Sequence, residues 1–236
     1  MNDSDAQGIR LAKRVAALAE CSRREAELLI ENGAVRVDGA VVLVPQARVL
    51  PAQHVAIEAG AQAVPVSPVT LLLHKPAGIG MGAAGKLLVP ANHHATDASP
   101  PKVLPRHLEK QRCMAPLEAG ASGLVIYTQE WRIERKLQED ANFIEHEVMV
   151  DVAGNVGADI TQRLTRPPVR VSIGRQADGM TGLRFAVKGL QPGQIADMCE
   201  AARLNIEAMK RIRVGRVPLA GLPPGQWRYL GADERF

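Results

Sequence analysis

Two adjacent arginines stand at the start of a predicted helix, where the chemistry open to them is phosphate binding. Ser22 and Glu25 form a capping box, in which the serine hydroxyl accepts from an early backbone N–H and the carboxylate accepts from the N–H of Ser22. The helix is therefore predicted to begin at Arg23. The helix dipole disfavours a cation there by about 0.3–1 kcal/mol, so Arg23 and Arg24 indicate an anionic ligand such as phosphate. The alternative is two solvated arginines that tolerate the position.

A second group of cations, Lys210, Arg211, Arg213 and Arg216, lies in and just after a predicted strand. Side chains alternate between the two faces of a strand, so Arg211 and Arg213 are expected to share a face. Such a row of donors would bind phosphates with an affinity that falls steeply with salt. The alternative is an edge strand that charge protects from aggregation. Because the N-terminal region is basic as well, we favour contact with RNA.

Residues 80–85 read Gly-Met-Gly-Ala-Ala-Gly and match the G-x-G-x-x-G pattern of dinucleotide-binding turns. However, Lys75-Pro76 already ends the preceding strand, and no helical pattern opens after Gly85. In residues 93–100, where an acidic ribose ligand should end a second strand, Asp97 stands in His-His-Ala-Thr-Asp-Ala-Ser-Pro, which does not read as the end of a strand. We therefore interpret residues 80–85 as a flexible glycine-rich loop, and we predict no cofactor.

Neither a metal site nor a serine nucleophile is predicted. The loop histidines at positions 93, 94 and 107 have no cysteine or carboxylate at ligand spacing. The three cysteines at positions 21, 113 and 199 are odd in number and form no C-x-x-C pair, which fits a reducing cytoplasm. Ser122 lies in Gly-Ala-Ser-Gly rather than G-x-S-x-G, so we interpret it as a turn residue.

Residues 1–60 are predicted to form a small unit that positions the first cations. Residues 10–20 form an amphipathic helix with a basic flank, and the Ser22 helix follows at once. Gly33 is expected to close that helix in the left-handed conformation, and Asp38-Gly39 to form the two-residue turn of a hairpin. A further short strand ends near Ile57. The small and proline-bearing residues 61–68 are predicted to be a linker.

Residues 69–236 are predicted to form a mixed α+β domain. The predicted strands cover 69–74, 123–128, 145–152, 169–173, 183–187 and 208–217, and the predicted helices cover 131–140 and 195–204. Between the strands predicted at 69–74 and 123–128, residues 77–112 show no helical or strand periodicity. This indicates an unusually long loop that is functional or mobile.

The composition sets limits on function without naming one. The chain has 236 residues, of which 46% are hydrophobic, and a formal net charge of +4, which favours an anionic partner only mildly. It shows no signal peptide and no run of 18 apolar residues, so we expect neither export nor a membrane span. We expect a cytoplasmic monomer.

Several motifs, taken in order, resemble known RNA-modifying proteins. Residues 10–39, including Cys21-Ser-Arg-Arg-Glu-Ala and Val35-Arg-Val-Asp-Gly39, resemble the small RNA-binding domain first seen in ribosomal protein four of the small subunit. The remainder resembles bacterial ribosomal RNA pseudouridine synthases of the small-subunit synthase A type, nearest the B and F branches of the large-subunit synthases. The matching segments are Leu73-His-Lys75-Pro76-Ala-Gly78, Leu117-Glu118, 122–128, 194–201, 210–215 and 219–228.

This resemblance implies a fold and a partner. The expected fold class is α+β: a small N-terminal αα-β RNA-binding domain and a mixed α/β synthase-like domain with a largely antiparallel sheet. The expected partner is RNA, specifically ribosomal RNA. The RNA-binding residues would be Arg10, Lys13, Ser22, Arg23, Arg24, Arg36, Lys210, Arg211 and Arg213.

The resemblance also implies a reaction, the isomerisation of a flipped-out uridine by a carboxylate that acts covalently. Glu118 stands at the nucleophile position where the family has aspartate, Lys75 helps to shape the pocket, and Val148 stands where a tyrosine stacks on the base. The arginine that pairs with the carboxylate is missing from Pro192-Gly-Gln-Ile-Ala-Asp-Met198. A displacement of about 1 Å can lower a rate ~100-fold, and the missing stacking forfeits about 1–3 kcal/mol.

We therefore expect an RNA-binding protein whose isomerase activity is weak or lost. Two alternatives stay open. The first is an active synthase that uses Glu118 as its nucleophile. The second is a module that binds another protein through the former active-site cleft.

Overall fold

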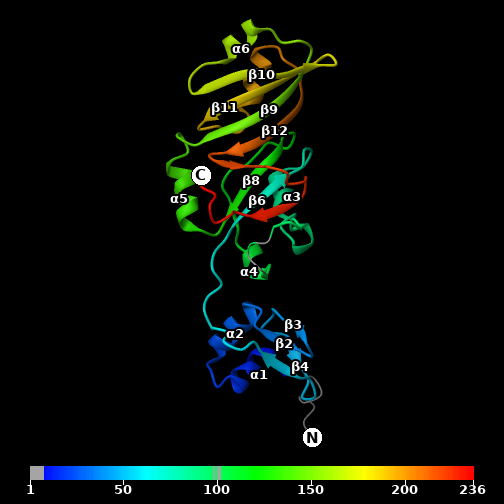
Figure 1. The fold of residues 1–236 in the computed structure, drawn as a ribbon, viewed down its shortest axis with the longest axis vertical. Coiled ribbons are helices and arrows are strands. Elements are labelled where there is room, and N and C mark those ends of the chain that lie inside the picture. The colour runs from blue at the N-terminus through cyan, green and yellow to red at the C-terminus, as the bar shows by residue number, and fades with distance from the viewer. Residues whose placement is uncertain (1–7, 98, 100–101) are drawn as a thin grey trace. The chain divides into compact units, whose positions relative to one another are not determined.

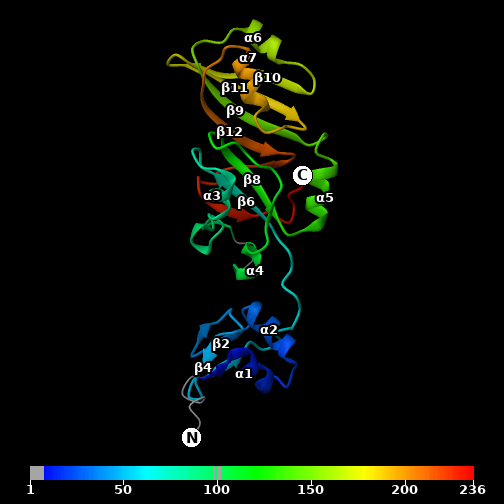
Figure 2. The same cartoon turned by 180° about the vertical axis from the view of Figure 1, so that it is seen from behind.

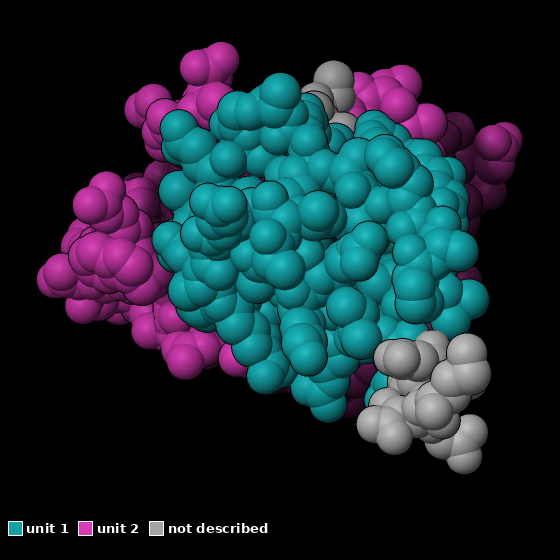
Figure 3. Space-filling model, turned by 90° about the horizontal axis from the view of Figure 1, so that it is seen from below, with its two compact units in different colours: residues 1–68, 102–109 teal, residues 69–101, 110–236 magenta. Residues whose placement is uncertain are grey.

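The computed structural model divides the chain into two compact units (Figures 1 and 3). Unit 1 comprises residues 1–68 and 102–109, and unit 2 comprises residues 69–101 and 110–236. The structure describes residues 8–97, 99 and 102–236. Segment 102–109, which we expected within the long loop of the second domain, belongs to unit 1. Its Arg106 forms an ion pair with Glu31 at 2.6 Å.

Unit 1 is built from short helices and strands. Its helices are α1 (Leu11–Leu18), α2 (Arg23–Glu31) and α4 (Pro105–Leu108), and its strands are β1 (Ile9–Arg10), β2 (Val35–Val37), β3 (Ala40–Val41), β4 (Arg48–Val49) and β5 (Val55–Ile57). The order β3-β2-β5 forms an antiparallel sheet, and β1 pairs with β4. The core of the unit contains Leu11, Val15, Leu29, Ile30 and Val35.

The local predictions for α2 and the hairpin after it are confirmed. The Ser22 hydroxyl accepts from the Glu25 N–H at 3.2 Å, and the Ser22 N–H donates to the Glu25 carboxylate at 2.8 Å. Gly33 follows the helix with a φ of 71°. Asp38 and Gly39 both have positive φ, as a type I′ hairpin turn requires.

Unit 2 is built on one large sheet. Its main strands follow the order β10 (Val169–Ala177), β11 (Met180–Lys188), β9 (Glu145–Ala153), β12 (Ile206–Val214), β8 (Ser122–Thr128), β6 (Thr70–Lys75) and β14 (Trp227–Tyr229), with β13 (Val217–Pro218) beside β12 and β7 (Arg112–Cys113) beside β8. Only the β12–β8 pair is parallel among these described strands. The expected mixed α/β unit with a largely antiparallel sheet is confirmed.

The helices of unit 2 are α3 (Met81–Gly85), a 3₁₀ turn at Pro90–Asn92, α5 (Trp131–Glu139), α6 (Ala158–Leu164) and α7 (Gln194–Ala201). α6 and α7 lie beside the β10–β11 end of the sheet (Figure 2), and α7 buries Ile195 and Cys199 against Val148 and Phe185. A second core around Leu72, Leu124 and Ile126 includes Leu137 of α5.

The structure extends several of the expected elements. The strands predicted at 169–173 and 183–187 continue to meet at a turn on Asp178-Gly179, and α3 interrupts the long loop. An interval made mainly of glycine and alanine has no apolar period, so periodicity could not reveal α3. Among the described residues, no helix is long and apolar enough to cross a membrane.

Candidate active site and cationic surfaces

Glu118 lies in the segment that connects β7 to β8. It is half-buried, and its carboxylate accepts a hydrogen bond from the backbone N–H of Gly193. Gly193 is the N-cap residue of α7 and has a left-handed backbone with a φ of 82°. The carboxylate is therefore held at the N-terminus of a helix, where the dipole favours negative charge.

Lys75, at the end of β6, supports the same segment from within the unit. Its side chain is fully buried, and its ammonium group donates to the carbonyls of Ala119 at 3.2 Å and Ala121 at 2.7 Å. It also reaches the carbonyls of Pro76 and Ile79. Burial lowers the pKa of Lys75, and the nearby charge of Glu118 opposes that shift. The structure thus brings Lys75 and Glu118 to one loop.

Arg211 is buried rather than exposed, so the prediction that it binds phosphate is wrong. Only 2% of the residue is accessible, and its guanidinium donates to the carbonyls of Leu124, Ala115 and Pro116. The reason is a register irregularity in β12 between Arg211 and Arg213, which places their side chains on opposite faces. Burial lowers the pKa of Arg211 to about 10. Instead, Arg211 fixes the segment just before Glu118 by hydrogen bonding to its backbone carbonyls.

Val148 lies in the core and not in an open pocket. It is 1% exposed and packs in the cluster that contains Phe185 and Ile195. In this structure Val148 therefore cannot contact a base, because the surrounding side chains cover it. Its position has lost both the aromatic ring and the accessible surface that stacking needs.

His146 is a partly buried polar residue that was not predicted from the sequence. It lines a cavity of about 90 Å³ together with Pro116, Pro192 and Arg211. Its Nδ1 atom is buried and has no hydrogen-bond partner among the described residues. Burial, and secondarily the charges of Arg211 and Arg213, lower the pKa of His146 to about 3. The sequence feature that could have indicated this position is a histidine that alternates in step with the inward-facing valines of β9.

We expect His146 to make unit 2 less stable in acid. Its pKa is near 6.5 in the unfolded chain and about 3 in the folded one, so the unfolded state binds the proton first. Its contribution to stability is thus complete above pH 6.5 and is lost as the pH falls toward 3. Urea unfolding of His146→Phe should show a flatter dependence on pH across this range than the wild-type protein. Parallel pH profiles would contradict the assignment.

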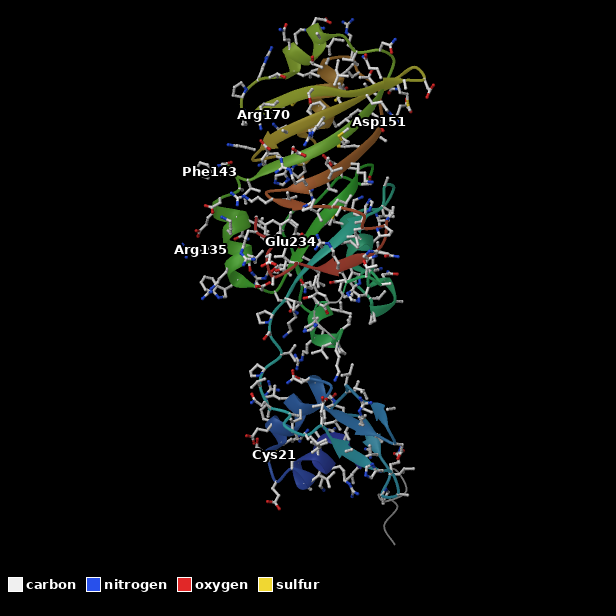
Figure 4. All side chains as sticks on the ribbon, viewed as in Figure 1. Cys21, Arg135, Phe143, Asp151, Arg170 and Glu234 are labelled. Carbon is white, nitrogen blue, oxygen red and sulfur yellow. The ribbon has the colours of Figure 1, made fainter. Side chains whose placement is uncertain are left out.

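Arg213 belongs to a network of ion pairs on the other face of the sheet. It binds Glu145 at 2.7 Å and Glu147 at 2.6 Å, and these carboxylates also pair with Arg170, labelled in Figure 4, and with Arg184. Hydrogen bonds from Arg213 and then Arg184 lower the pKa of Glu147 to about 2. Two carboxylates thus offset much of the charge of Arg213. Lys210, on the same strand, is exposed.

Several of the expected cations of unit 1 meet at one place. Arg10, Lys13 and Arg23 line a hollow of about 570 Å³ together with Arg48, which the sequence reasoning missed. Arg48 approaches from β4 and donates to the Gly8 carbonyl at 2.9 Å. Its position follows from the pairing of β1 with β4, which no local pattern indicated.

The other expected residues of unit 1 do not line this hollow. Arg24 directly follows Arg23 in the sequence and forms an ion pair with Glu27 at 3.7 Å. Arg36 lies on the hairpin and donates to the Gly39 carbonyl. Ser22 is engaged in the capping box, so its hydroxyl supports the helix start that carries the arginines.

Comparisons with known proteins agree with this architecture. Residues 9–55 match the model of the S4 domain. The chain is 26% identical over 234 residues to an uncharacterized RNA pseudouridine synthase of Aquifex aeolicus, covering 96% of this chain and 94% of the relative. A second such protein, from Mycobacterium bovis, is 29% identical over 238 residues, with coverages of 97% and 92%.

Two further likenesses extend the comparison. The dual-specificity RNA pseudouridine synthase RluF of Escherichia coli is 26% identical over 239 residues, which cover 96% of this chain and 77% of the relative. A crystal structure of a pseudouridylate synthase superposes with a TM-score of 0.56 at 17% identity, covering 95% of this chain and 96% of that chain.

The fold and the site define a two-unit protein with an S4 domain and a larger unit that has the pseudouridylate synthase fold. Over nearly its whole length, the chain is similar to proteins of the RNA pseudouridine synthase family.

Proposed function

We propose that this protein binds structured ribosomal RNA in the cytoplasm as a monomer, and that its isomerase activity is weak or lost. The observation that carries the binding proposal is the hollow in unit 1. Four cationic side chains, Arg10, Lys13, Arg23 and Arg48, converge there at the starts of α1 and α2. The amide groups of a helix start and a cluster of guanidinium groups are both suited to phosphate oxygens.

The start of α2 has two arginines close to a single shared carboxylate. Arg23 and Arg24 share one carboxylate, that of Glu27, and their side chains are 65% and 63% exposed. Exposed ion pairs contribute little to stability, so RNA phosphates can replace Glu27 as a partner at small cost. The names of the relatives support RNA as the partner.

The proposal of weak or lost isomerisation is supported at three positions. Glu118 carries a longer carboxylate than the family aspartate, and Gly193 offers a backbone N–H in place of an arginine side chain. Val148 is buried and has no aromatic face. An efficient catalyst needs its reacting groups held in a productive geometry, and each of these changes alters that geometry.

A salt series tests the binding proposal. Fluorescence anisotropy with labelled fragments of ribosomal RNA should give a log Kd that rises linearly with log salt, because phosphate contacts release counterions. An affinity that does not respond to salt, or no affinity for any RNA, would instead favour the protein-interaction alternative.

An active synthase is the second candidate, and the fixed position of the Glu118 carboxylate favours it. Its test is pseudouridine mapping after incubation of ribosomal RNA with a stoichiometric amount of protein. Our proposal expects conversion that is slow or absent. Fast conversion that Glu118→Ala abolishes, and that Glu200→Ala on the exposed side of α7 leaves unchanged, would establish the enzyme and overturn the proposed loss.

A further inference from the structure

The contact between Glu118 and Gly193 joins two segments that lie 75 residues apart in the chain. One segment, 114–116, leads into Glu118, and the other, 189–192, leads into Gly193. Both segments line the cavity beside His146. The hydrogen bond therefore ties together two parts of the wall of this cavity.

The backbone of Gly193 makes this contact possible. Its φ of 82° lies in the left-handed region, which a residue with a side chain adopts only at a cost. A Cβ atom at this position would meet no other atom within 4 Å, so the glycine is required by its backbone conformation and not by lack of space. The left-handed turn directs the N–H of the N-cap residue toward the carboxylate.

The segment that carries Glu118 has little freedom to adjust its distance from α7. Arg211 holds the carbonyls of Ala115 and Pro116 on one side of Glu118, and Lys75 holds those of Ala119 and Ala121 on the other. Because both flanks are anchored, the length of the side chain decides whether the carboxylate reaches Gly193.

We infer that Glu118 and Gly193 form one clasp, in which a left-handed glycine makes a backbone N–H the positioning group for the longer carboxylate. The longer carboxylate at position 118 and the missing arginine side chain are then linked changes and not two independent losses. The backbone N–H of Gly193 takes over the positioning of the carboxylate. Gly193 acts through the carboxylate, which makes it a positioning residue. The clasp lies at the site of the proposed function. Its existence does not depend on that proposal, but its importance for activity does.

Amide hydrogen exchange of the full-length protein, followed by NMR, tests the clasp. The Gly193 amide should exchange at least about tenfold faster in Glu118→Ala than in the wild type, because it loses its acceptor. Glu118→Asp keeps the charge but is one methylene shorter, and it should behave like Glu118→Ala. Glu118→Gln keeps the length and one acceptor oxygen, so it should retain part of the protection. Glu200→Ala removes a carboxylate from α7, the helix that Gly193 caps, and should leave the exchange rate of the Gly193 amide unchanged.

Two results would overturn the clasp. One is wild-type protection of Gly193 in Glu118→Asp, and the other is equal exchange in the wild type and Glu118→Ala. The amide of Ile126, in the core strand β8, reports whether each variant is folded. If Glu118→Ala fails to fold, the comparison of Glu118→Asp with Glu118→Gln still decides. RNA affinity should stay within about twofold of wild type in these variants, because the four cations of the hollow on which the binding proposal rests lie in unit 1. An absence of RNA binding would remove the proposed function and leave the exchange result standing.

Discussion

Reversing Arg23 and Arg24 to glutamate should weaken the binding of ribosomal RNA by about 100-fold at roughly 0.1 M salt. Each reversal replaces a phosphate partner with a charge that repels phosphate. The slope of log Kd against log salt should also fall by about 2, one for each lost phosphate contact. Fluorescence anisotropy across a salt series measures both quantities.

The same variant should remain folded. Acidic residues are favoured in the first turn of a helix, and the capping box between Ser22 and Glu25 does not involve either arginine side chain. Repulsion from Glu27 opposes this gain by only about 0.5 kcal/mol. A large loss of affinity should therefore appear with little change in the thermal midpoint.

A matched control separates local contact from total charge. Arg132→Glu with Arg135→Glu on α5 makes the same change in formal net charge, from +4 to zero, since each reversal lowers the net charge by two. Arg135 is labelled in Figure 4, and its side chain is 63% exposed. Equal weakening in the two double variants would show that net charge, and not the start of α2, governs binding.

Replacing Arg211 with alanine should lower the free energy of unfolding of unit 2 by about 3–5 kcal/mol. The variant leaves a cavity and removes the charged donor from the carbonyls of Leu124 and Ala115. A buried acceptor that loses its partner costs about 1–3 kcal/mol by itself. Arg211→Lys should recover only part of the loss, because an ammonium group cannot reproduce the planar fork of donors.

Tryptophan fluorescence during urea unfolding provides the measurement. Both tryptophans of the chain, Trp131 and Trp227, lie in unit 2, so the signal reports that unit alone. Arg216→Ala serves as the control, since Arg216 is an exposed cation just beyond the end of β12 and should change the stability by about 0.5 kcal/mol or less. A loss below about 1 kcal/mol in Arg211→Ala would contradict the bracing role.

The predictions from sequence were accurate where the determining interactions are local. The start of α2 depends on two hydrogen bonds between Ser22 and Glu25, three residues apart. Its end and the hairpin that follows depend on the ability of Gly33 and Gly39 to adopt positive φ. Alternating apolar residues likewise indicated the strands of unit 2, because period 2 is a property of a single strand.

Contacts between distant segments were decided only by the tertiary structure. Alternation along β12 predicted one shared face for Arg211 and Arg213, but a single irregularity in its pairing with β9 turned Arg211 inward. The irregularity depends on the partner strand, so the sequence of β12 does not contain it. The contribution of Arg48 to the hollow in unit 1 likewise depends on strand pairing.

The site at Glu118 shows the same division. The sequence by itself determined that a carboxylate stands at position 118 and a glycine at position 193, and the resemblance marked position 118 and the segment 192–198 as departures. Only the tertiary structure joined them, through a hydrogen bond across 75 residues, because the sequence around Gly193 does not indicate which acceptor its backbone N–H meets. Side-chain identity is encoded residue by residue, whereas the direction of a backbone donor is set by how the elements on either side of it pack.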